Sequence, residues 1–332
     1  MISPLIQPLT LGGLSFPVNI IQGPLAGVSC APFRRLVTEY SQPAFSCTEM
    51  ISCKTINHAR SMHRRYLHKD PHEGPVCFQL SGNDPEELGQ AVRLVTAHGA
   101  DLVDLNCGCP VNKIRSRGAG SRLLADPARI ATLIHAMKQN TSVPVSIKIR
   151  VDGSSQETYN GELMSMLNAS DVDFVVIHGR HWTQSYDEPC FYDQIRDFVQ
   201  HLKMPVIGNG DIKCLASLKK MQATGCAGYM VSRASVGRPW LIGHLIQESE
   251  QKIGITPSCE EKLQLLLRHV QALADLLQSE KAAVLQARTF AKYYVRDVLH
   301  MPQRNEKINQ CHTLDDLCQL FNITPRQRDM AS

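Results

Sequence analysis

Two cysteines lie close together in the motif Asp104-Leu105-Asn106-Cys107-Gly108-Cys109-Pro110, which follows an apolar run from Ala100. The run is typical of a buried strand, and the Gly and Pro after it indicate a tight turn. A turn at a strand end can present a reactive side chain without burying loop backbone. The residues that follow, 113–121, are basic and rich in glycine. Because a thiol beside cationic groups is more often a chemical site than a packing residue, the motif predicts a reactive cysteine.

Two stretches of the chain carry positive charge and no acid. Residues 51–69 contain five Lys or Arg and three His, and residues 111–125 contain four Lys or Arg. Stretches of one sign attract polyanions, although a solvated basic face would explain either stretch by itself. Because the second stretch directly follows the cysteine turn, the pair favours a phosphate-rich substrate.

The composition indicates a soluble globular protein. The 332 residues are 43% hydrophobic and 20% charged, with a net charge of +4. The twelve cysteines are too sparse for a disulfide scaffold and lack the paired spacing of a zinc site, so we expect reduced core thiols and no metal. No apolar run is long enough to span a bilayer, and no basic leader precedes an apolar stretch. We therefore expect a cytoplasmic protein without membrane contact, and a monomer.

Eight short apolar runs alternate with amphipathic segments such as Pro85–His98 and Pro127–Gln139. Apolar strands that alternate with helices indicate a parallel sheet covered on both faces. Eight such units predict a TIM (β/α)8 barrel. A doubly wound open sheet is the alternative, but no GxGxxG follows the first strand. The runs are Asn19–Gln22, Ala44–Thr48, Val76–Leu80, Leu102–Leu105, Val145–Ile149, Phe174–Ile177, Val206–Ile207 and Gly228–Val231.

Polar or charged residues follow almost every predicted strand, at the end where TIM barrels carry their active sites. The last two of these segments, Gly208-Asn209-Gly210-Asp211 and Ser232-Arg233, lie where such barrels bind phosphate. Glycines expose backbone N–H groups there, and a guanidinium can hold two phosphate oxygens. The pattern predicts a large polar ligand, with a phosphate, on the barrel mouth.

The chain changes character near its C-terminal end, and we expect a barrel domain over residues 1–243 and a helical domain over residues 244–332. Gly254-Ile255-Thr256-Pro257 is a candidate linker. Apolar periodicity predicts three helices. Within the second, Arg288, Lys292 and Arg296 are spaced to share one face, which predicts either a basic stripe that could bind a ligand or an ordinary charged surface. The helices are expected at Leu263–Leu277, Val284–Leu299 and Leu314–Phe321.

Six short motifs, spread between residues 23 and 211, can be compared together with those of known protein families. They are Gly23-Pro24-Leu25-Ala26-Gly27-Val28, Asp104-Leu105-Asn106-Cys107-Gly108-Cys109-Pro110, Gly118-Ala119-Gly120-Ser121, Ile147-Lys148-Ile149-Arg150, Ile177-His178-Gly179-Arg180 and Gly208-Asn209-Gly210-Asp211. On these motifs the chain resembles the tRNA-dihydrouridine synthases, flavin enzymes that reduce uridine in tRNA, and it is most similar to the bacterial members. The Asn-x-Gly-Cys-Pro element is highly specific, and the others are individually modest.

The resemblance implies FMN on the barrel mouth and NADPH as its reductant. Gln79 would offer an amide to the polar edge of the flavin ring, and Lys148 would stabilise the anionic reduced ring. The other interpretation of Lys148 is an ion pair with Asp211 or Glu49, since a lone buried lysine is costly. Carried over by position, the residues that would hold the flavin are Pro24, Leu25, Gln79, Lys148, His178, Asn209, Asp211, Ser232 and Arg233.

The family pattern places the catalytic cysteine directly before the proline, which is Cys109, with Cys107 as a structural neighbour. The resemblance implies that hydride passes from the reduced flavin to carbon 6 of uracil and that Cys109 gives a proton to carbon 5. Cysteine thiols are mostly protonated at neutral pH, as a general acid requires.

The resemblance also implies that the substrate is a uridine in tRNA, taken out of the RNA stack before reaction. Asn106, Arg150 and Tyr186 match the family's uracil pocket. The rest of the RNA would be bound through its phosphates, and the candidate residues for these contacts are Lys113, Arg115, Arg288 and Lys292.

Two rival functions stay open from the sequence. One is an FMN-dependent dehydrogenase of a free pyrimidine, which would have no use for the basic stretches or the helical tail. The other is a catalytically inactive RNA-binding barrel. It is suggested by departures from the family pattern at Leu25, where methionine is common, and at Ser232 and Ala234, where glycines are common.

Overall fold

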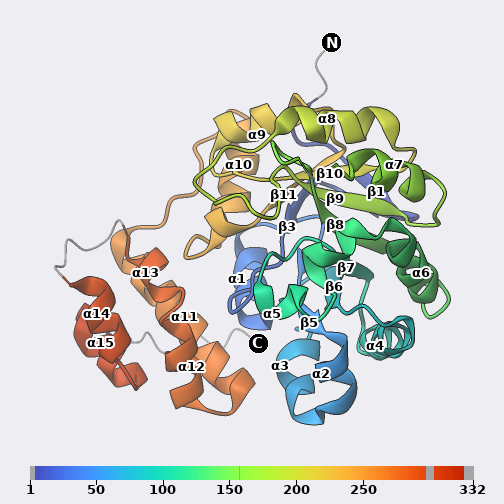
Figure 1. Ribbon diagram of the computed structural model, residues 1–332. Coiled ribbons are helices and arrows are strands. Elements are labelled where there is room, and N and C mark those ends of the chain that lie inside the picture. The colour runs from blue at the N-terminus through green and yellow to red at the C-terminus, as the bar shows by residue number, and fades with distance from the viewer. Residues whose placement is uncertain (1–3, 157, 297–302, 325–332) are drawn as a thin grey trace.

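The computed structural model describes residues 4–156, 158–296 and 303–324, and within them eight parallel strands form a closed barrel (Figure 1). The open-sheet alternative is excluded, because β11 pairs with β3, and β4 pairs with both β3 and β6. Each predicted apolar run overlaps one of these strands, so the predicted TIM barrel is confirmed. In order around the ring they are β3 (Ile20–Gln22), β4 (Ser46–Cys47), β6 (Val76–Ser81), β7 (Leu102–Asn106), β8 (Val145–Arg150), β9 (Phe174–His178), β10 (Val206–Asn209) and β11 (Gly228–Val231). A short strand, β5 (Ile51–Ser52), also pairs with β6.

Helices surround the barrel, and two of them begin at the signals that the sequence carries. The side chains of Asp84 and Asp126 accept the backbone N–H groups of Glu87 and Arg129, and a proline opens each helix. These helices, α4 (Pro85–Ala97) and α6 (Pro127–Lys138), confirm the predicted amphipathic segments. The other barrel helices are α1 (Ala31–Tyr40), α2 (Cys53–His58), α3 (His63–Leu67), α5 (Asn112–Arg115), α7 (Asn160–Asn168), α8 (Tyr192–His201), α9 (Leu215–Gln222) and α10 (Leu241–Ser249).

A hairpin that the sequence reading missed closes the bottom of the barrel. Strands β1 (Leu9–Leu11) and β2 (Leu14–Phe16) pair antiparallel. The hairpin turn lies beside the residues that precede β8 and β9, and the Phe16 ring packs 5.8 Å from that of Phe45 in the barrel interior. The lower interior is therefore an apolar core, and polar chemistry is confined to the opposite end.

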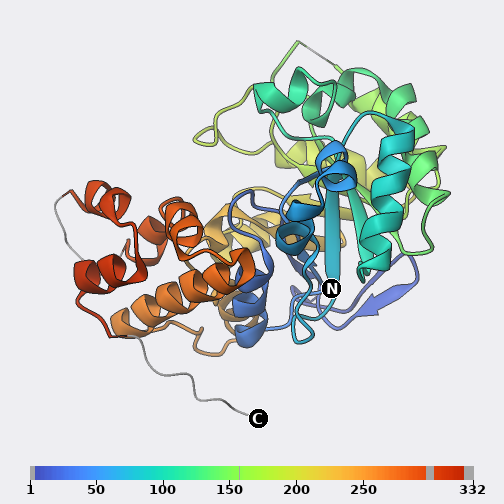
Figure 2. The ribbon, with the colours of Figure 1, turned by 90° about the horizontal axis from the view of Figure 1, so that it is seen from below.

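The C-terminal helices lie beside the barrel on one flank (Figures 1 and 2). Helix α11 (Cys259–Leu277) begins at a capping box formed by Ser258 and Glu261, and α15 spans Leu314–Phe321 as predicted. The remaining helices are α12 (Glu280–Ala287), α13 (Ala291–Tyr294) and α14 (Arg304–Gln310).

The prediction of a single helix over Val284–Leu299 is wrong. The last residues of that range, 297–299, lie outside the described residues. Helix α12 ends at Ala287, and the Thr289 hydroxyl donates to the Gln286 carbonyl at 2.8 Å. Such local bonding offers the backbone an alternative to continued helix. The three basic residues therefore do not share one helix face: Arg288 caps α12, Lys292 lies in α13, and Arg296 follows α13.

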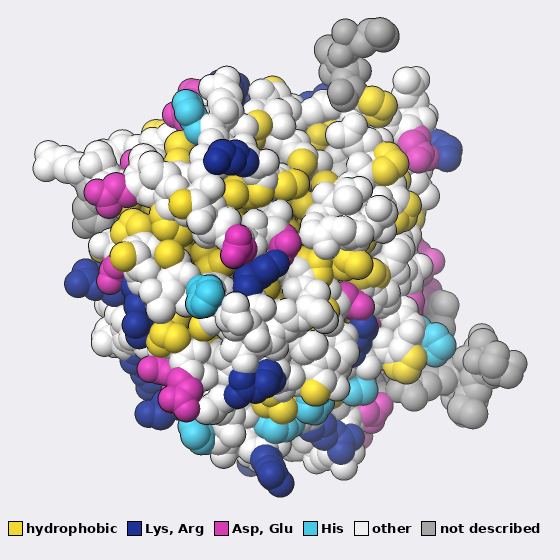
Figure 3. All heavy atoms as spheres, turned by 90° about the vertical axis from the view of Figure 1, so that its right-hand side faces the viewer, with side chains coloured by type: hydrophobic (Ala, Val, Ile, Leu, Met, Phe, Trp, Pro, Cys, Tyr) yellow, Lys and Arg dark blue, Asp and Glu magenta, His cyan; other side chains and the backbone are white. Residues whose placement is uncertain are grey.

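The helical segment contacts the barrel through several side chains. Arg268 pairs with Glu39 on α1 at 2.6 Å, and Arg64 donates to the carbonyl of Asp275 at 3.0 Å. Helix α10 spans the expected boundary between residues 243 and 244, so the division into two domains stays a prediction. None of the described helices has the length and apolar character needed to cross a membrane. Acidic and basic side chains both occur across the barrel face drawn in Figure 3.

Candidate active site

The cysteine turn at the end of β7 is held by two side chains. The Asn106 Oδ1 atom accepts the backbone N–H groups of Gly108 at 3.2 Å and Cys109 at 2.9 Å. Arg150, at the end of β8, donates from Nε to the Gly108 carbonyl at 2.7 Å. A Cβ atom on Gly120 would lie 2.8 Å from the Cys109 carbonyl, so the segment after the turn can approach it only with glycine there.

The two thiols of the turn have different surroundings. Cys107 is fully buried, and its N–H donates to the Lys148 carbonyl at 2.8 Å. Burial raises the pKa of Cys107 well above its ordinary value, so this thiol is an inert packing group. Cys109 is partly exposed at the barrel mouth. The geometry supports Cys109 as the reactive cysteine.

Beneath the turn, the barrel interior holds a layer of paired polar side chains. Gln79 and Asp104 lie opposite each other on β6 and β7, and Ser146 lies opposite Asp104 on β8. The Asp104 carboxylate accepts the Ser146 hydroxyl at 2.7 Å and the Gln79 amide at 2.8 Å. The Gln79 Oε1 atom in turn accepts from the Asn106 amide at 2.8 Å. Burial raises the pKa of Asp104 to about 6, so the carboxylate is ionised at neutral pH.

Lys148 is a cation enclosed near the centre of the mouth. Its ammonium group donates to the Asn209 side chain at 2.8 Å. The ion pairs considered for it are wrong, since Asp211 pairs with Arg180 and Arg233, and Glu49 pairs with Arg65. Burial first, and the charge of Arg150 second, lower the pKa of Lys148 to about 8.

The loop after β9 is fixed by Arg180, whose side chain is only 1% exposed. It donates to the Glu188 carbonyl, to the Asp211 carboxylate at 2.5 Å and to the Tyr186 carbonyl at 3.1 Å. Tyr186 is about half exposed, and the Arg233 guanidinium lies 3.7 Å from the centre of its ring. Tyr186 therefore lies at the outer edge of the mouth, and its place in a uracil pocket stays a prediction.

His178 ends β9 beneath this loop. Burial and four nearby cations lower its pKa well below the ordinary value, so the ring is neutral. The cations are Lys148, Arg150, Arg180 and Arg233. Their concentration at one end of the barrel favours an anionic ligand there.

The ends of β10 and β11 form a cradle suited to phosphate. The described residues offer no acceptor to the backbone N–H groups of Gly210, Ser232 and Arg233. The Asn209 amide donates to the Ser232 hydroxyl at 3.3 Å and holds the two strand ends together, and Asp211 holds the Arg233 side chain at 3.1 Å. Free N–H groups beside a guanidinium can bind the oxygens of a phosphate. The enclosed ammonium group of Lys148 can stabilise a ring that carries negative charge. The residues present thus fit FMN.

The loop after β3 forms another side of the mouth. The N–H of Leu25 donates to the Ser29 hydroxyl at 2.9 Å, and the N–H of Gly27 donates to the Glu49 carboxylate at 2.6 Å. Pro24 and Leu25 are partly exposed there. The Gln286 amide of α12 donates to the Gly27 carbonyl at 2.9 Å, so the C-terminal helices lie directly beside the mouth.

The residues expected to grip RNA differ in their surroundings. Lys113 is exposed on α5, whereas the Arg115 guanidinium lies 3.1 Å from the centre of the Trp182 ring and donates to the Ser121 hydroxyl at 3.2 Å. Arg288 donates to the Cys311 carbonyl at 2.7 Å, and Lys292 lies 5.3 Å from the ring centre of its neighbour Tyr293. Arg115 and Arg288 therefore have structural partners besides any RNA.

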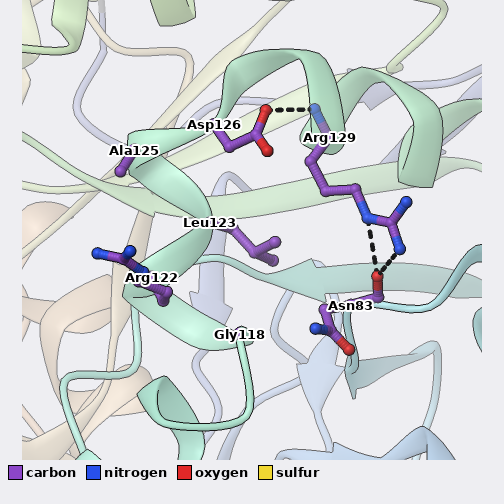
Figure 4. Close-up of a pocket in the computed structure, with 7 residues that line it drawn as sticks. All are labelled: Asn83, Gly118, Arg122, Leu123, Ala125, Asp126 and Arg129. Atoms are coloured by element: carbon purple, nitrogen blue, oxygen red, sulfur yellow. Dashed lines mark hydrogen bonds between the residues drawn. The ribbon is translucent and has the colours of Figure 1, made fainter.

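A pocket of about 520 Å³ lies on the rim between the loops that follow β6 and β7 (Figure 4). The Arg129 guanidinium donates to the Asn83 carbonyl at one side of it, and Asp126 caps α6. Arg122 is exposed on the other side. Part of its lining comes from the second basic stretch, residues 111–125. Its full lining is Asn83, Gly118, Arg122, Leu123, Ala125, Asp126 and Arg129.

Sequence reasoning did not assign Asp104, Arg180 or Trp182 to the site. Side chains alternate between the two faces of a strand, so Asp104 and Asn106 lie on the same face of β7. This alternation in the sequence could have placed Asp104 in the site. Arg180 and Trp182 make contacts within and between loops, and the spacing of residues in the sequence does not predict such contacts. In the described part of the chain, no group of three or more His, Cys, Asp or Glu side chains is arranged to hold a metal ion.

A family model described as "Dihydrouridine synthase (Dus)" matches residues 21–327. A probable tRNA-dihydrouridine synthase 1 of Synechocystis sp. is 32% identical over 314 residues, 93% of this chain and 87% of the relative. The tRNA-dihydrouridine synthase B of Pasteurella multocida is 28% identical over 306 residues, 91% of each chain. Among solved structures, morphinone reductase is similar with a TM-score of 0.57 at 12% identity, covering 77% of this chain and 92% of that chain. This last likeness shows the fold alone.

Proposed function

This chain belongs to the dihydrouridine synthase family, and we infer from that membership that it is a flavin-dependent oxidoreductase that reduces uridine in tRNA to 5,6-dihydrouridine. We further propose that the flavin is FMN and its reductant NADPH, and that Cys109 is the proton donor. The observation that carries the catalytic assignment is the difference between the two thiols: Cys107 is sealed in the core, and Cys109 is presented at the barrel mouth.

When bound, FMN would supply the hydride that reaches carbon 6 of uracil. Its phosphate would lie on the free N–H groups at Gly210, Ser232 and Arg233. Lys148 would face the ring, where a positive charge stabilises negative charge that develops on it. Lys148 is held for this contact by Asn209. Gln79, His178, Pro24 and Leu25 would complete the flavin contacts.

Cys109 would hold the proton for carbon 5. Arg150 and Asn106 fix its turn from two sides, so the thiol is oriented before the substrate arrives. Tyr186 would limit the pocket on the solvent side. Positioned proton donors are typically worth roughly 10²–10⁴ in rate.

The experiment uses undermodified tRNA from cells that lack dihydrouridine, purified holoenzyme and NADPH, with dihydrouridine measured by mass spectrometry. Cys109→Ala is expected to lose ~10²-fold or more in turnover and to keep its flavin. Cys107→Ala is the matched control, since it removes a thiol two residues away that only packs. Loss of flavin in Cys109→Ala, or equal loss of turnover in both variants, would refute the assignment.

The same assay separates the rival functions. Free uridine reduced as efficiently as tRNA would favour a dehydrogenase of free pyrimidines. A purified protein that binds tRNA but no flavin would favour an inactive RNA-binding barrel. The free N–H groups at Ser232 and Arg233 argue against the second rival, because the backbone can bind phosphate without glycine at 232 or 234.

For the RNA, we propose phosphate contacts along the rim of the mouth. Lys113 and Arg122 are exposed on the segment that directly follows the cysteine turn. Arg288 lies at the end of α12, whose Gln286 contacts the loop after β3, and Lys292 lies on α13. Such contacts give affinity without sequence information and weaken as salt rises. We expect the enzyme to act as a cytoplasmic monomer.

A further inference from the structure

A buried carboxylate is linked to the cysteine turn by an unbroken chain of hydrogen bonds. Asp104 accepts from Gln79 at 2.8 Å, Gln79 accepts from Asn106 at 2.8 Å, and Asn106 accepts from the N–H of Cys109 at 2.9 Å. The residues Gln79, Asp104 and Asn106 are at most 8% exposed. Water therefore competes little with these bonds, and each amide keeps the orientation that its protein partners impose.

The direction of this chain is fixed at both ends. An ionised carboxylate can only accept, so Gln79 must turn its NH2 group to Asp104 and its oxygen to Asn106. Asn106 must then donate to Gln79 and turn its own oxygen toward the cysteine turn. At the other end the backbone N–H groups of Gly108 and Cys109 can only donate, and that oxygen is the acceptor they require. Both ends thus specify the same orientation for the two amides.

We propose that Asp104 is a positioning residue for Cys109: its carboxylate sets the orientation of the Gln79 and Asn106 amides and thereby holds the turn that presents the thiol. Asp104 itself does not reach the reacting atoms. The inference rests on the proposed role of Cys109, and it assigns to Asp104 a part in the reaction that its place deep in the barrel would not suggest.

The consequence of losing the carboxylate follows from the same geometry. Without an acceptor at position 104, the Gln79 amide can rotate and turn its NH2 group toward Asn106. The NH2 group of Asn106 then faces another donor, and only the two backbone N–H groups of the turn still hold the Asn106 side chain. With this support loosened, the turn opens more readily, which moves the thiol away from its working position and exposes it to solvent.

The test compares Asp104→Leu with Asp104→Asn at pH 8. Leucine has the same branched shape as aspartate but offers no acceptor, whereas asparagine keeps an acceptor for Gln79 and can donate its NH2 group to the Ser146 hydroxyl. Alkylation of Cys109 by iodoacetamide is followed by peptide mass spectrometry on flavin-free protein, and turnover is measured with tRNA. Asp104→Leu is expected to alkylate several-fold faster and to turn over about 10²-fold more slowly, the cost of a misplaced catalytic group. Asp104→Asn should stay within about tenfold of wild type, since one hydrogen bond is weakened and none is lost.

Ser146→Ala is the matched control, because it removes the other bond to the Asp104 carboxylate and leaves the chain to Cys109 intact. Its alkylation rate should match that of wild type. If Asp104→Leu does not fold, Gln79→Met breaks the next bond in the same chain and is expected to give the same faster alkylation. An unchanged alkylation rate in the folded variant, or an Asp104→Asn protein as impaired as Asp104→Leu, would overturn the proposal. Alkylation needs neither RNA nor flavin, so it decides this inference even if the wild-type protein forms no dihydrouridine.

Discussion

Lys148 should destabilise the flavin-free protein, and the size of the effect should depend on pH in a defined direction. Burial and Arg150 lower the pKa of Lys148 from its usual 10.5 to about 8. One pKa unit corresponds to about 1.4 kcal/mol, so keeping this lysine charged in the folded protein costs about 3 kcal/mol at pH 7. The positive charge of Lys148, which the flavin site needs, therefore lowers the stability of the folded protein.

The sign follows from proton binding. Between pH 8 and 10.5 the folded protein holds fewer protons on Lys148 than the unfolded chain does, so its contribution to the free energy of unfolding rises with pH. Between pH 7 and pH 9.5 the rise should be about 2 kcal/mol. Replacement by methionine removes this contribution and leaves the other titrating groups in place. The wild-type free energy of unfolding minus that of Lys148→Met should therefore increase by about 2 kcal/mol over the same interval.

Guanidinium unfolding of reduced, flavin-free protein, followed by tryptophan fluorescence at pH 7 and pH 9.5, measures this difference. Lys54→Met, which removes an exposed lysine from α2, is the control and should follow the pH dependence of wild type. A wild-type minus Lys148→Met difference that is constant with pH, or that falls as pH rises, would show that the ammonium group is not held at a cost and would refute the reasoning.

Three further outcomes follow from single contacts. Arg150→Met removes the donor to the Gly108 carbonyl, so we expect turnover with tRNA to fall about 10²-fold while flavin content, read from absorbance, stays the same; full activity would contradict the role of Arg150 in the turn. Glu73→Leu leaves the fully buried guanidinium of Arg34 without its carboxylate and should lower the free energy of unfolding, measured by guanidinium titration, by about 3–5 kcal/mol. An unchanged free energy of unfolding would show that the pair is solvated and not buried. Arg122→Ala should weaken tRNA binding and reduce the slope of log affinity against log salt by about 1, and an unchanged slope would exclude a phosphate contact at the rim pocket.

The local signals of the sequence predicted much of the architecture. Each apolar run with turn residues after it became a barrel strand, because a strand covered on both faces is mostly apolar. Helices α4 and α6 begin where Asp and Pro occur together, since these residues satisfy the first N–H groups of a helix. The prediction of a continuous helix through Arg288 and Lys292 was wrong. After Ala287 the backbone N–H groups of Thr289 and Phe290 donate three residues back instead of four, and no periodicity of apolar residues records that change.

For the site, the sequence by itself determined which strand ends carry polar groups and which cysteine precedes the proline. Local chemistry decides both, because parallel strands bring their ends to one mouth whatever the loops do. Only the tertiary structure decided the partners. It gave Lys148 an amide where an ion pair was considered, tied Arg150 to the cysteine turn, and joined Asp104 to Cys109 through Gln79 and Asn106. Such bonds join residues far apart in the chain, and their direction depends on burial that exists only once the barrel has closed.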